Sequence, residues 1–401
     1  MGNRERDAAT CGIYGVFSKF AGIRSPEHGR RIGITRLGHM YVRITEICGR
    51  IAAGIATAFC CAAMAGCMKY GPLPQESFSY PMPDDGTAEG VFIICEGNFM
   101  YGNASMSFYL PSTGELQNEI FARANGMKLG DVAQSMTMYD GTGYVVVNKS
   151  GVIFGMDPET FVVKRVIRGM GSPRYILFHG DKAYVTSLYE PEITVLDAHT
   201  MQPVGKIPTP GHTSTEQMAV FGDLMYVTCW SYDNTVLKID TRTDEIVGSI
   251  EVRNQPRQLT IDSRGKLWVL TDGGSAEGGT TDAPALYRID ASNGTVEKEF
   301  VFRRGDSPKG LCSDGAGETI YFLNGDLWRM DCDAENLPDE PFLESSGTIY
   351  YAIGVDPHNG DVYVGDAVDY QQQGVVYRLN DSGRCLDTLR VGITPTAFCF
   401  R

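Results

Sequence analysis

The sequence predicts an all-β fold, a seven-bladed β-propeller, because two landmarks recur in a fixed order along most of the chain. The first landmark is an aromatic residue inside an apolar run, spaced by 40 to 53 residues, at Tyr144, Tyr184, Tyr226, Trp268, Tyr321 and Tyr363. The second is an apolar residue followed by Asp or Asn, at Met156-Asp157, Leu196-Asp197, Ile239-Asp240, Ile289-Asp290, Met330-Asp331 and Leu379-Asn380. A repeat of about 40 residues that holds four short strands is typical of a propeller blade.

One repeat, Ser172 to Pro208, shows the expected blade in full. Four short runs follow one another there, at Tyr175 to Phe178, Lys182 to Leu188, Glu192 to Leu196 and Gln202 to Ile207. Gly, Asp and Pro separate runs in which apolar and polar residues alternate, and this pattern indicates strands joined by tight turns. One such sheet cannot bury both of its faces alone, so we expect neighbouring copies to complete the core.

The repeats predict seven blades and a closed ring. Six blades are expected at 132–167, 172–208, 214–252, 255–302, 307–345 and 348–392. Val91 to Phe121 supplies the later strands of one more blade but lacks a first strand. The last segment, Thr394 to Phe400, has the polar-Pro start of a first strand, so we expect it to complete that opening blade. Such pairing would leave no open sheet edge at the junction. The propeller domain is therefore predicted to span residues 90–401.

The N-terminal region predicts a lipoprotein leader. Residues 1–39 are basic without a clear period and are expected to be a non-native upstream extension, with Met40 as the true start. Residues 40–66 are expected to be the signal peptide, because their apolar part, Ile51 to Met64, is too short for a comfortable membrane span.

The end of this leader resembles a bacterial lipobox. Ala65-Gly66-Cys67 places small residues before a Cys, which implies cleavage before Cys67 and a lipid on its sulfur. The alternatives are an ordinary signal peptide that is cut nearby, or an anchor helix. Residues 67–89 are then expected to carry the lipid and a Pro-rich tether.

Composition agrees with a globular protein and limits its partners. Charged residues make up 21% and hydrophobic residues 43% of the chain. The net charge of −14 argues against a nucleic-acid partner. The mature chain keeps seven scattered Cys with no C-x-x-C motif and no zinc-ligand spacing. Cys95 and Cys399 are expected on adjacent strands, either as a disulfide or as two unpaired core thiols.

The sequence predicts neither a catalytic centre nor a metal centre. After Cys67 only four His remain, and His179, His199 and His358 fall in predicted turns. No metalloprotease, nucleophile-elbow or P-loop motif occurs. The Asp residues of the second landmark recur once per blade, so we expect them to cap turns through side-chain hydrogen bonds.

Residues of one propeller face are the candidates for ligand binding. This face carries the start of each first strand and the loops that join second to third strands. Those segments hold aromatic, amide and Arg side chains, which suit a large flat ligand or a protein partner. The candidate ligand-binding residues are Phe99, Tyr101, Arg174, Tyr189, Gln217, Trp230, Tyr232, Arg257, Tyr350 and Tyr370.

Several motifs resemble a known family. Tyr184-Val185-Thr186 and Tyr226-Val227-Thr228 are similar to the repeats of YVTN surface-layer propellers, also called YncE-like. Over Val91 to Arg401 the chain resembles Bacteroidales lipoproteins of that class. The segments that carry this resemblance are Glu96-Gly97-Asn98-Phe99, Gly130 to Ser135, Val147 to Gly151, Ser172 to Tyr175 and Thr215 to Met218.

The resemblance implies a function in vitamin uptake. Members of this class include BtuG-type proteins, which capture cobalamin (vitamin B12) at the cell surface and pass it to a TonB-dependent outer-membrane transporter. For this chain, the resemblance therefore implies a cobalamin or related corrinoid ligand, no catalytic cofactor, and an outer-membrane lipid anchor. Met68-Lys69-Tyr70 follows Cys67 where surface lipoproteins often carry acidic residues, so the surface and the periplasmic face both stay open.

Two other classes of function are compatible with the sequence. A propeller scaffold could bind another transporter, its ligand or a protein partner. A propeller hydrolase or lyase would need a metal or a His/Glu centre that converges on the channel.

Overall fold

The computed structural model describes residues 90–274 and 282–401. The chain divides into two units, Met1–Cys67 and Met68–Arg401, and all described residues belong to the second. The predicted extension, signal peptide, lipidated Cys67 and tether lie outside the described residues. In the described ranges the one helix is α2 (Ile120–Asn125), whose first two residues end the segment Val91 to Phe121 for which the sequence predicts strands. Within these ranges no helix has the length and hydrophobicity of a membrane-spanning segment.

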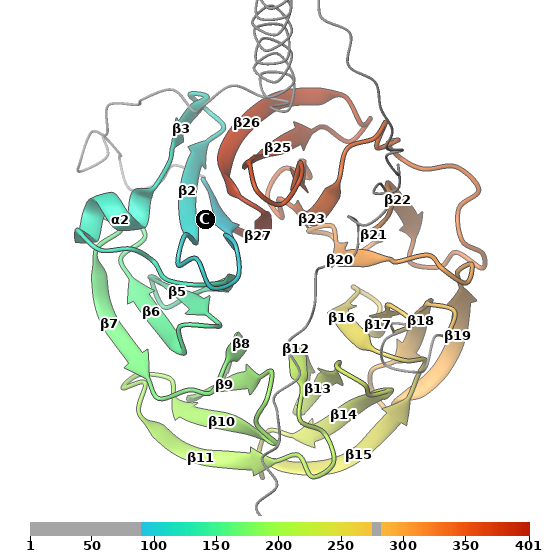
Figure 1. The fold of residues 1–401 in the computed structure, drawn as a ribbon. Helices are drawn as coiled ribbons and strands as arrows, with labels where there is room; N and C mark the ends of the chain where they lie inside the picture. Colours follow the sequence, from blue (N-terminus) through green and yellow to red (C-terminus); the bar gives the residue numbers. More distant parts are fainter. Residues whose placement is uncertain (1–89, 275–281) are drawn as a thin grey trace, which may run out of the picture. The chain divides into compact units, whose positions relative to one another are not determined.

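Seven sheets form the blades of one ring (Figure 1). Blade 1 consists of β27 (Pro395–Phe400), β1 (Val91–Cys95), β2 (Ser105–Leu110) and β3 (Glu115–Gln117). Blade 2 consists of β4 (Ala133–Tyr139), β5 (Thr142–Val147), β6 (Val152–Met156) and β7 (Val163–Arg168). Blade 3 consists of β8 (Pro173–His179), β9 (Lys182–Ser187), β10 (Glu192–Asp197) and β11 (Pro203–Pro208). Blade 4 consists of β12 (Thr215–Phe221), β13 (Leu224–Cys229), β14 (Thr235–Asp240) and β15 (Glu245–Glu251).

The remaining three blades complete the ring. Blade 5 consists of β16 (Pro256–Ile261), β17 (Lys266–Thr271), β18 (Ala285–Asp290) and β19 (Thr295–Val301). Blade 6 consists of β20 (Lys309–Ser313), β21 (Thr319–Asn324) and β22 (Asp326–Asp331). Blade 7 consists of β23 (Tyr350–Val355), β24 (Val362–Asp366), β25 (Gln373–Leu379) and β26 (Cys385–Ile393). The first strand of each blade lies innermost (Figure 1), and residues of all seven of these strands line a central channel.

The two ends of the described chain close the ring, as the sequence predicts. β27 pairs antiparallel with β1, with Phe92 opposite Cys399 and Ile93 opposite Phe398. The backbone N–H of Arg401 then donates to the carbonyl of Gly90 at 2.9 Å. The last strand is thus the innermost strand of the first blade, and all seven blades have neighbours on both sides.

Blade 6 has three strands where the sequence predicts four. Its fourth position is occupied by an irregular segment that makes one bridge to β22, between Leu327 and Leu343. This segment contains Pro338 and Pro341. Proline lacks the N–H that a sheet ladder needs, so two prolines so close together prevent a regular outer strand.

The recurring aromatic residues hold neighbouring blades together. Tyr184 of β9 is fully buried and packs with Met225 and Val227 of the next blade. Its hydroxyl donates to Asp244 Oδ1 at 2.8 Å, in the turn that precedes the outer strand of that blade. Tyr226 repeats the arrangement one blade further on, where its hydroxyl donates to the carbonyl of Ala291 at 2.7 Å. The aromatic landmark therefore marks the core between blades, where a large ring buries the most apolar surface.

The recurring Asp residues cap turns, as expected from their spacing. Asp197 Oδ1 accepts the backbone N–H groups of His199 at 3.1 Å and Thr200 at 2.7 Å. Asp157, Asp240 and Asp290 accept equivalent backbone bonds in their own blades. The hydrogen bond from the Arg242 side chain is the main reason that the pKa of Asp240 falls to about 2.

The cysteines of the described residues are all free thiols. Cys95 and Cys399 lie on the paired strands β1 and β27, but Cys399 faces Phe92 across the ladder rather than Cys95. Both are buried, and burial raises the pKa of each thiol to about 12. Of the two alternatives for this pair, the structure shows unpaired core thiols.

Candidate functional site

The register of each innermost strand is interrupted at its first residues. Such an irregularity occurs in all seven blades, between Ala133/Ser135, Pro173/Ile176, Thr215/Met218, Pro256/Gln258, Lys309/Cys312, Tyr350/Ala352 and, opposite Pro395, Ile94/Cys95. A bulge twists a strand and changes the direction of the side chains beside it. The seven bulges lie at one end of the channel, so they decide which side chains face its mouth.

The channel mouth is a cavity of about 320 Å³. Its volume is at the lower end of the roughly 300–1,000 Å³ range of small-molecule pockets. Polar side chains from six consecutive blades, 2 to 7, line it, namely Gln134, Tyr175, Gln217, Arg257, Gln258, Lys309 and Tyr351. Deeper in the channel the wall includes Cys312, Ile353 and Phe398. We call this cavity the channel mouth.

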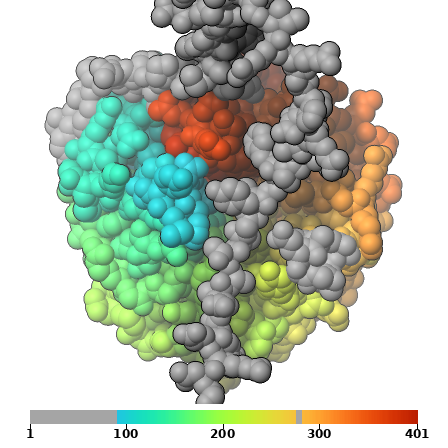
Figure 2. All heavy atoms as spheres, viewed as in Figure 1, coloured from blue at the N-terminus to red at the C-terminus, as the bar shows by residue number. Residues whose placement is uncertain are grey.

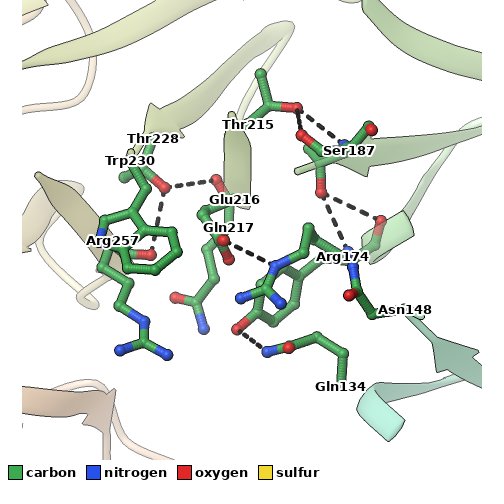
Figure 3. Close-up of polar contacts among 12 residues, drawn as sticks. Gln134, Asn148, Arg174, Ser187, Thr215, Glu216, Gln217, Thr228, Trp230 and Arg257 are labelled. Atoms are coloured by element: carbon green, nitrogen blue, oxygen red, sulfur yellow. Dashed lines mark hydrogen bonds and ion pairs between the residues drawn. The ribbon is translucent and has the colours of Figure 1, made fainter. Parts of the chain in front are cut away.

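An ion pair between blades 3 and 4 lies beside the channel mouth (Figure 3). Arg174 Nε donates to Glu216 Oε1 at 2.7 Å, and the two side chains are 7% and 0% exposed. The second carboxylate oxygen of Glu216 is buried and has no hydrogen-bond partner among the described residues. This pair is therefore desolvated, and each charge depends on the other.

Hydrogen bonds hold several other side chains of the mouth. Gln134 Nε2 donates to the hydroxyl of Tyr175 at 3.2 Å, and Gln217 Oε1 accepts the backbone N–H of Leu259 at 3.0 Å. The Tyr351 hydroxyl donates to Glu96 Oε2 at 3.0 Å. Burial raises the pKa of Glu96 above its usual range, although the Tyr351 hydrogen bond opposes that shift.

Two cations of neighbouring blades stand out because they stack on aromatic rings. The guanidinium of Arg257 lies 5.0 Å from the centre of the Trp230 ring, and Lys309 Nζ lies 5.1 Å from the centre of the Tyr351 ring. Trp230 Nε1 donates to Asp272 Oδ2 at 2.9 Å, which orients the indole under Arg257. Burial, and next the charge of Arg257, lower the pKa of Lys309.

Aromatic side chains surround the mouth on the same face of the propeller. Five of the six exposed Phe and Tyr residues in the described part of the chain lie in loops that join second to third strands: Phe99, Tyr101, Tyr189, Tyr232 and Tyr370. The sixth, Phe221, ends β12 at the opposite face. The loop between β1 and β2, blue in Figure 2, lies on the face that the figure views. We call these five residues the aromatic rim.

The backbone of three rim loops is held in an unfavourable conformation. Met100, Tyr232 and Tyr370 have φ of 70°, 61° and 62°, in the left-handed region that non-glycine residues avoid. Hydrogen bonds hold two of these residues, since Asp131 accepts from the backbone N–H of Met100 and the carbonyl of Tyr370 accepts from Asn98 Nδ2. Strained residues of this kind concentrate at binding and catalytic sites.

The ten candidate residues lie in three environments: the aromatic rim, the channel mouth with its immediate surroundings, and the hydrophobic core. Phe99, Tyr101, Tyr189, Tyr232 and Tyr370 form the aromatic rim. Gln217 and Arg257 line the channel mouth, with Trp230 half-buried beneath Arg257 and Arg174 buried beside it.

Tyr350 requires a correction. It is 7% exposed and packs in the core edge-on to Tyr377, with 6.5 Å between the ring centres. The next residue, Tyr351, lines the channel mouth instead. The bulge between Tyr350 and Ala352 shifts the alternation by one residue, which a strict period of two does not anticipate.

Glu96 is the main functional candidate that the sequence analysis missed as a site residue. It directly follows β1, the second strand of blade 1, where the candidate loops begin in the other blades. The predicted closure by Thr394 to Phe400 already makes β1 the second strand of blade 1, so Glu96 opens the same loop as the candidates Phe99 and Tyr101. Its place at the start of that loop was the signal that could have identified it.

One group of side chains in the described residues could hold a metal ion. His212, Cys229 and Asp233 each offer a ligand atom, and these atoms lie within 4.8 Å of one another. His212 Nδ1 and Asp233 Oδ2 are already joined by a hydrogen bond of 2.7 Å. Burial and the charge of Asp233 raise the pKa of Cys229 well above its usual range, which opposes the thiolate that zinc prefers.

Comparison with known proteins identifies the family and the fold. The family model described as "Domain of unknown function (DUF5074)" matches residues 89–384. No curated protein matches the chain.

Solved structures share the fold at low sequence identity. A quinonprotein alcohol dehydrogenase-like protein from Bacteroides thetaiotaomicron has a TM-score of 0.60 and 14% identity, over 77% of each chain. Hydrazine synthase of Kuenenia stuttgartiensis has a TM-score of 0.52 and 16% identity, over 66% of this chain and 88% of that one. The WD40 β-propeller domain of Doa1 has a TM-score of 0.52 and 12% identity, over 70% and 86%. At these identities the likeness shows the propeller fold alone.

Proposed function

The chain belongs to the DUF5074 family of domains of unknown function, and on this premise we propose that it is a propeller scaffold that captures a corrinoid ligand. The ligand we propose is cobalamin, and its recipient a TonB-dependent outer-membrane transporter. The observation that carries the proposal is that five exposed aromatic residues surround a polar channel mouth on one face.

The chemistry of this face matches a flat ligand with polar arms. Exposed rings such as Tyr232 and Tyr189, 77% and 72% exposed, offer large surfaces for stacking. Gln134, Gln217 and Gln258 line the mouth between the rings. Cobalamin combines a broad corrin ring with amide side chains, so it could contact both kinds of group at once.

The rim loops are also ordered in advance. The backbone N–H of Met100 donates to both oxygens of Asp131, at 3.1 and 2.9 Å, and this bond ties the blade 1 loop to blade 2. The ring of Tyr370 stands edge-on to Tyr351, with 5.7 Å between the ring centres. A platform that is rigid before binding loses little conformational entropy, which favours tight capture.

The carboxylates at the mouth support binding rather than acid–base catalysis. Glu216 is held by Arg174, and Glu96 accepts a hydrogen bond from Tyr351. A hydrolase or lyase would need a carboxylate, a His or a metal that faces the substrate. We therefore favour a non-catalytic role over the enzyme alternative.

Calorimetric titration with cyanocobalamin tests the proposal, on protein that lacks the first 67 residues. We expect binding with one-to-one stoichiometry. Tyr232→Ala should weaken it about tenfold or more, because exposed aromatic anchors contribute strongly to binding. The melting temperature should change little, since this side chain is 77% exposed.

Phe221→Ala is the matched control, because Phe221 is an exposed aromatic residue at the opposite face. It should leave the affinity unchanged. If micromolar cyanocobalamin does not bind, the corrinoid proposal is rejected, and the scaffold must serve another ligand or a protein partner.

We further propose that the protein is anchored to the outer membrane through a lipid on Cys67. Cys67→Ala should move the protein from the membrane fraction to the soluble fraction, since acyl chains contribute about 0.8 kcal/mol per buried CH₂ to membrane binding. Fractionation followed by immunoblotting measures this. A variant that stays in the membrane fraction would rule out the lipobox interpretation.

A further inference from the structure

Polar side chains of all seven blades lie in or beside the channel mouth, and several of them form pairs between neighbouring blades. Arg174 of blade 3 pairs with Glu216 of blade 4, and Tyr351 of blade 7 pairs with Glu96 of blade 1. Gln134 of blade 2 donates to Tyr175 of blade 3. Two of the side chains that line the mouth are cations outside these pairs, Arg257 of blade 5 and Lys309 of blade 6.

Neither of these cations forms an ion pair with a carboxylate among the described residues. Although burial alone would lower the pKa of Arg257, the charges of Glu216 and Asp272 act on it from farther away and help to raise its pKa. The guanidinium of Arg257 contacts the face of Trp230, and the ammonium of Lys309 contacts the face of Tyr351. Asp272, the nearby carboxylate in blade 5, accepts hydrogen bonds from Trp230 Nε1 at 2.9 Å and from the backbone N–H of Gly274 at 3.0 Å.

This arrangement places two cations close together with no counter-ion among the described residues in contact. The chain has a net charge of −14, yet it places two cations of adjacent blades in one partly enclosed cavity. Like charges that share a desolvated site repel each other, and a charge removed from water costs free energy unless it is paired. The lowered pKa of Lys309, caused by burial and then by Arg257, agrees with this repulsion.

We propose that Arg257 and Lys309 bind an oxyanion group of the ligand, a carboxylate or a phosphate ester, at the channel mouth. Arg257 supplies a planar donor fork that matches two oxygens, and Lys309 supplies a compact charge from the neighbouring blade. Figure 3 shows the polar ends of Arg257, Gln217 and Gln134 directed toward the same space, so amide donors can complete the site.

This inference rests on the proposed function and divides the ligand between two parts of one face. The aromatic rim takes the flat part of the ligand, and the channel mouth takes its acidic group. Cobalamin contains a phosphodiester in addition to its corrin ring and amides, so it carries a group of the required class.

The first test measures anion binding itself, with inorganic phosphate and acetate as probes. Phosphate, acetate or both should bind saturably to protein lacking the first 67 residues and raise its melting temperature. In the double variant Arg257→Gln/Lys309→Gln the affinity should fall about tenfold or more, because two charge-assisted contacts are lost. Lys149→Gln is the matched control, since Lys149 is an exposed cation stacked on Phe99 in the rim, outside the cavity. Its effect should be negligible.

The outcome also identifies the acidic group. Preference for phosphate over acetate indicates a phosphate ester, and the reverse indicates a carboxylate. If neither anion binds saturably, or if the double variant binds as well as the parent protein, the proposal is overturned. The double variant should fold, because neither cation is in an ion pair whose loss would leave a buried carboxylate without its partner. Its melting temperature without anion should lie within a few degrees of that of the parent.

A second titration separates this inference from the corrinoid proposal. Cyanocobalamin carries the phosphodiester, whereas cobinamide lacks it. If both proposals hold, the double variant should lose affinity for cyanocobalamin and keep its affinity for cobinamide. Anion binding without corrinoid binding would support the oxyanion site and reject the corrinoid. If the double variant binds cyanocobalamin as well as the parent protein does, the corrinoid proposal is supported and the oxyanion site is rejected.

Discussion

Deletion of Thr394–Arg401 is expected to abolish the folded propeller. This segment contains β27, which is the innermost strand of blade 1 and contacts blades 2 and 7. Its loss would expose Phe92 and Ile94, which are fully buried in β1, and would leave β1 as an open edge. Burial of one large apolar side chain contributes about 1.5–3 kcal/mol. Several such losses together would remove most of the free energy of unfolding of a typical domain, which is roughly 5–15 kcal/mol.

Urea unfolding followed by circular dichroism measures this effect. We expect the deleted protein to show no cooperative transition, and a cooperative transition near that of the parent would contradict the role of β27 in closure.

A permuted variant is the control for lost contacts. Val91 lies opposite Phe400 in the ladder, so residues 394–401 could be joined ahead of residue 90 by a short turn. This variant keeps every contact of β27 but changes its connection, and it should recover cooperative unfolding.

Arg174→Met is expected to destabilise the protein by about 3–5 kcal/mol, because it leaves the charge of Glu216 buried without its partner. The Glu216 side chain is 0% exposed, and one of its oxygens already lacks a hydrogen bond. The free energy of unfolding in urea is the measurement.

Two further variants show whether the lost pair is the cause. Arg174→Met/Glu216→Leu should recover most of the loss, because apolar replacement of a whole buried pair is often neutral or stabilising. Lys206→Met, which breaks the exposed pair with Glu192 on an outer strand, should have little effect. Equal destabilisation by the single and the double variants would mean that packing, rather than charge, explains the loss.

Sequence reasoning located most of the fold because the repeat is local and recurs. The aromatic at Tyr184 or Tyr226 and the Asp at Asp197 or Asp240 serve the same structural purpose in each blade, so each copy confirms the others. Blade 6 departed from prediction because Pro338 and Pro341 interrupt its outer strand, although the rest of its repeat is intact.

The candidate site was predicted less completely. The topology of a propeller places first-strand starts and second-to-third-strand loops on one face, which brought Arg257 and Tyr232 into the candidate set. It did not distinguish Tyr350 from Tyr351, since a bulge of one residue reverses which of the two faces the channel.

The sequence by itself determined the all-β class, the seven repeats and the closure by Thr394 to Phe400, because strand period and turn residues act over a few neighbouring positions. Only the tertiary structure decided how the charges at the channel mouth combine. Glu216 pairs with Arg174, Glu96 with Tyr351, and Arg257 and Lys309 form no ion pair with a carboxylate among the described residues. These partners come from different blades. Gln134 and Tyr175 are 41 residues apart in the sequence, and Glu96 and Tyr351 are 255 residues apart. Pairing across such separations depends on bulge geometry and ring closure, which no local pattern records.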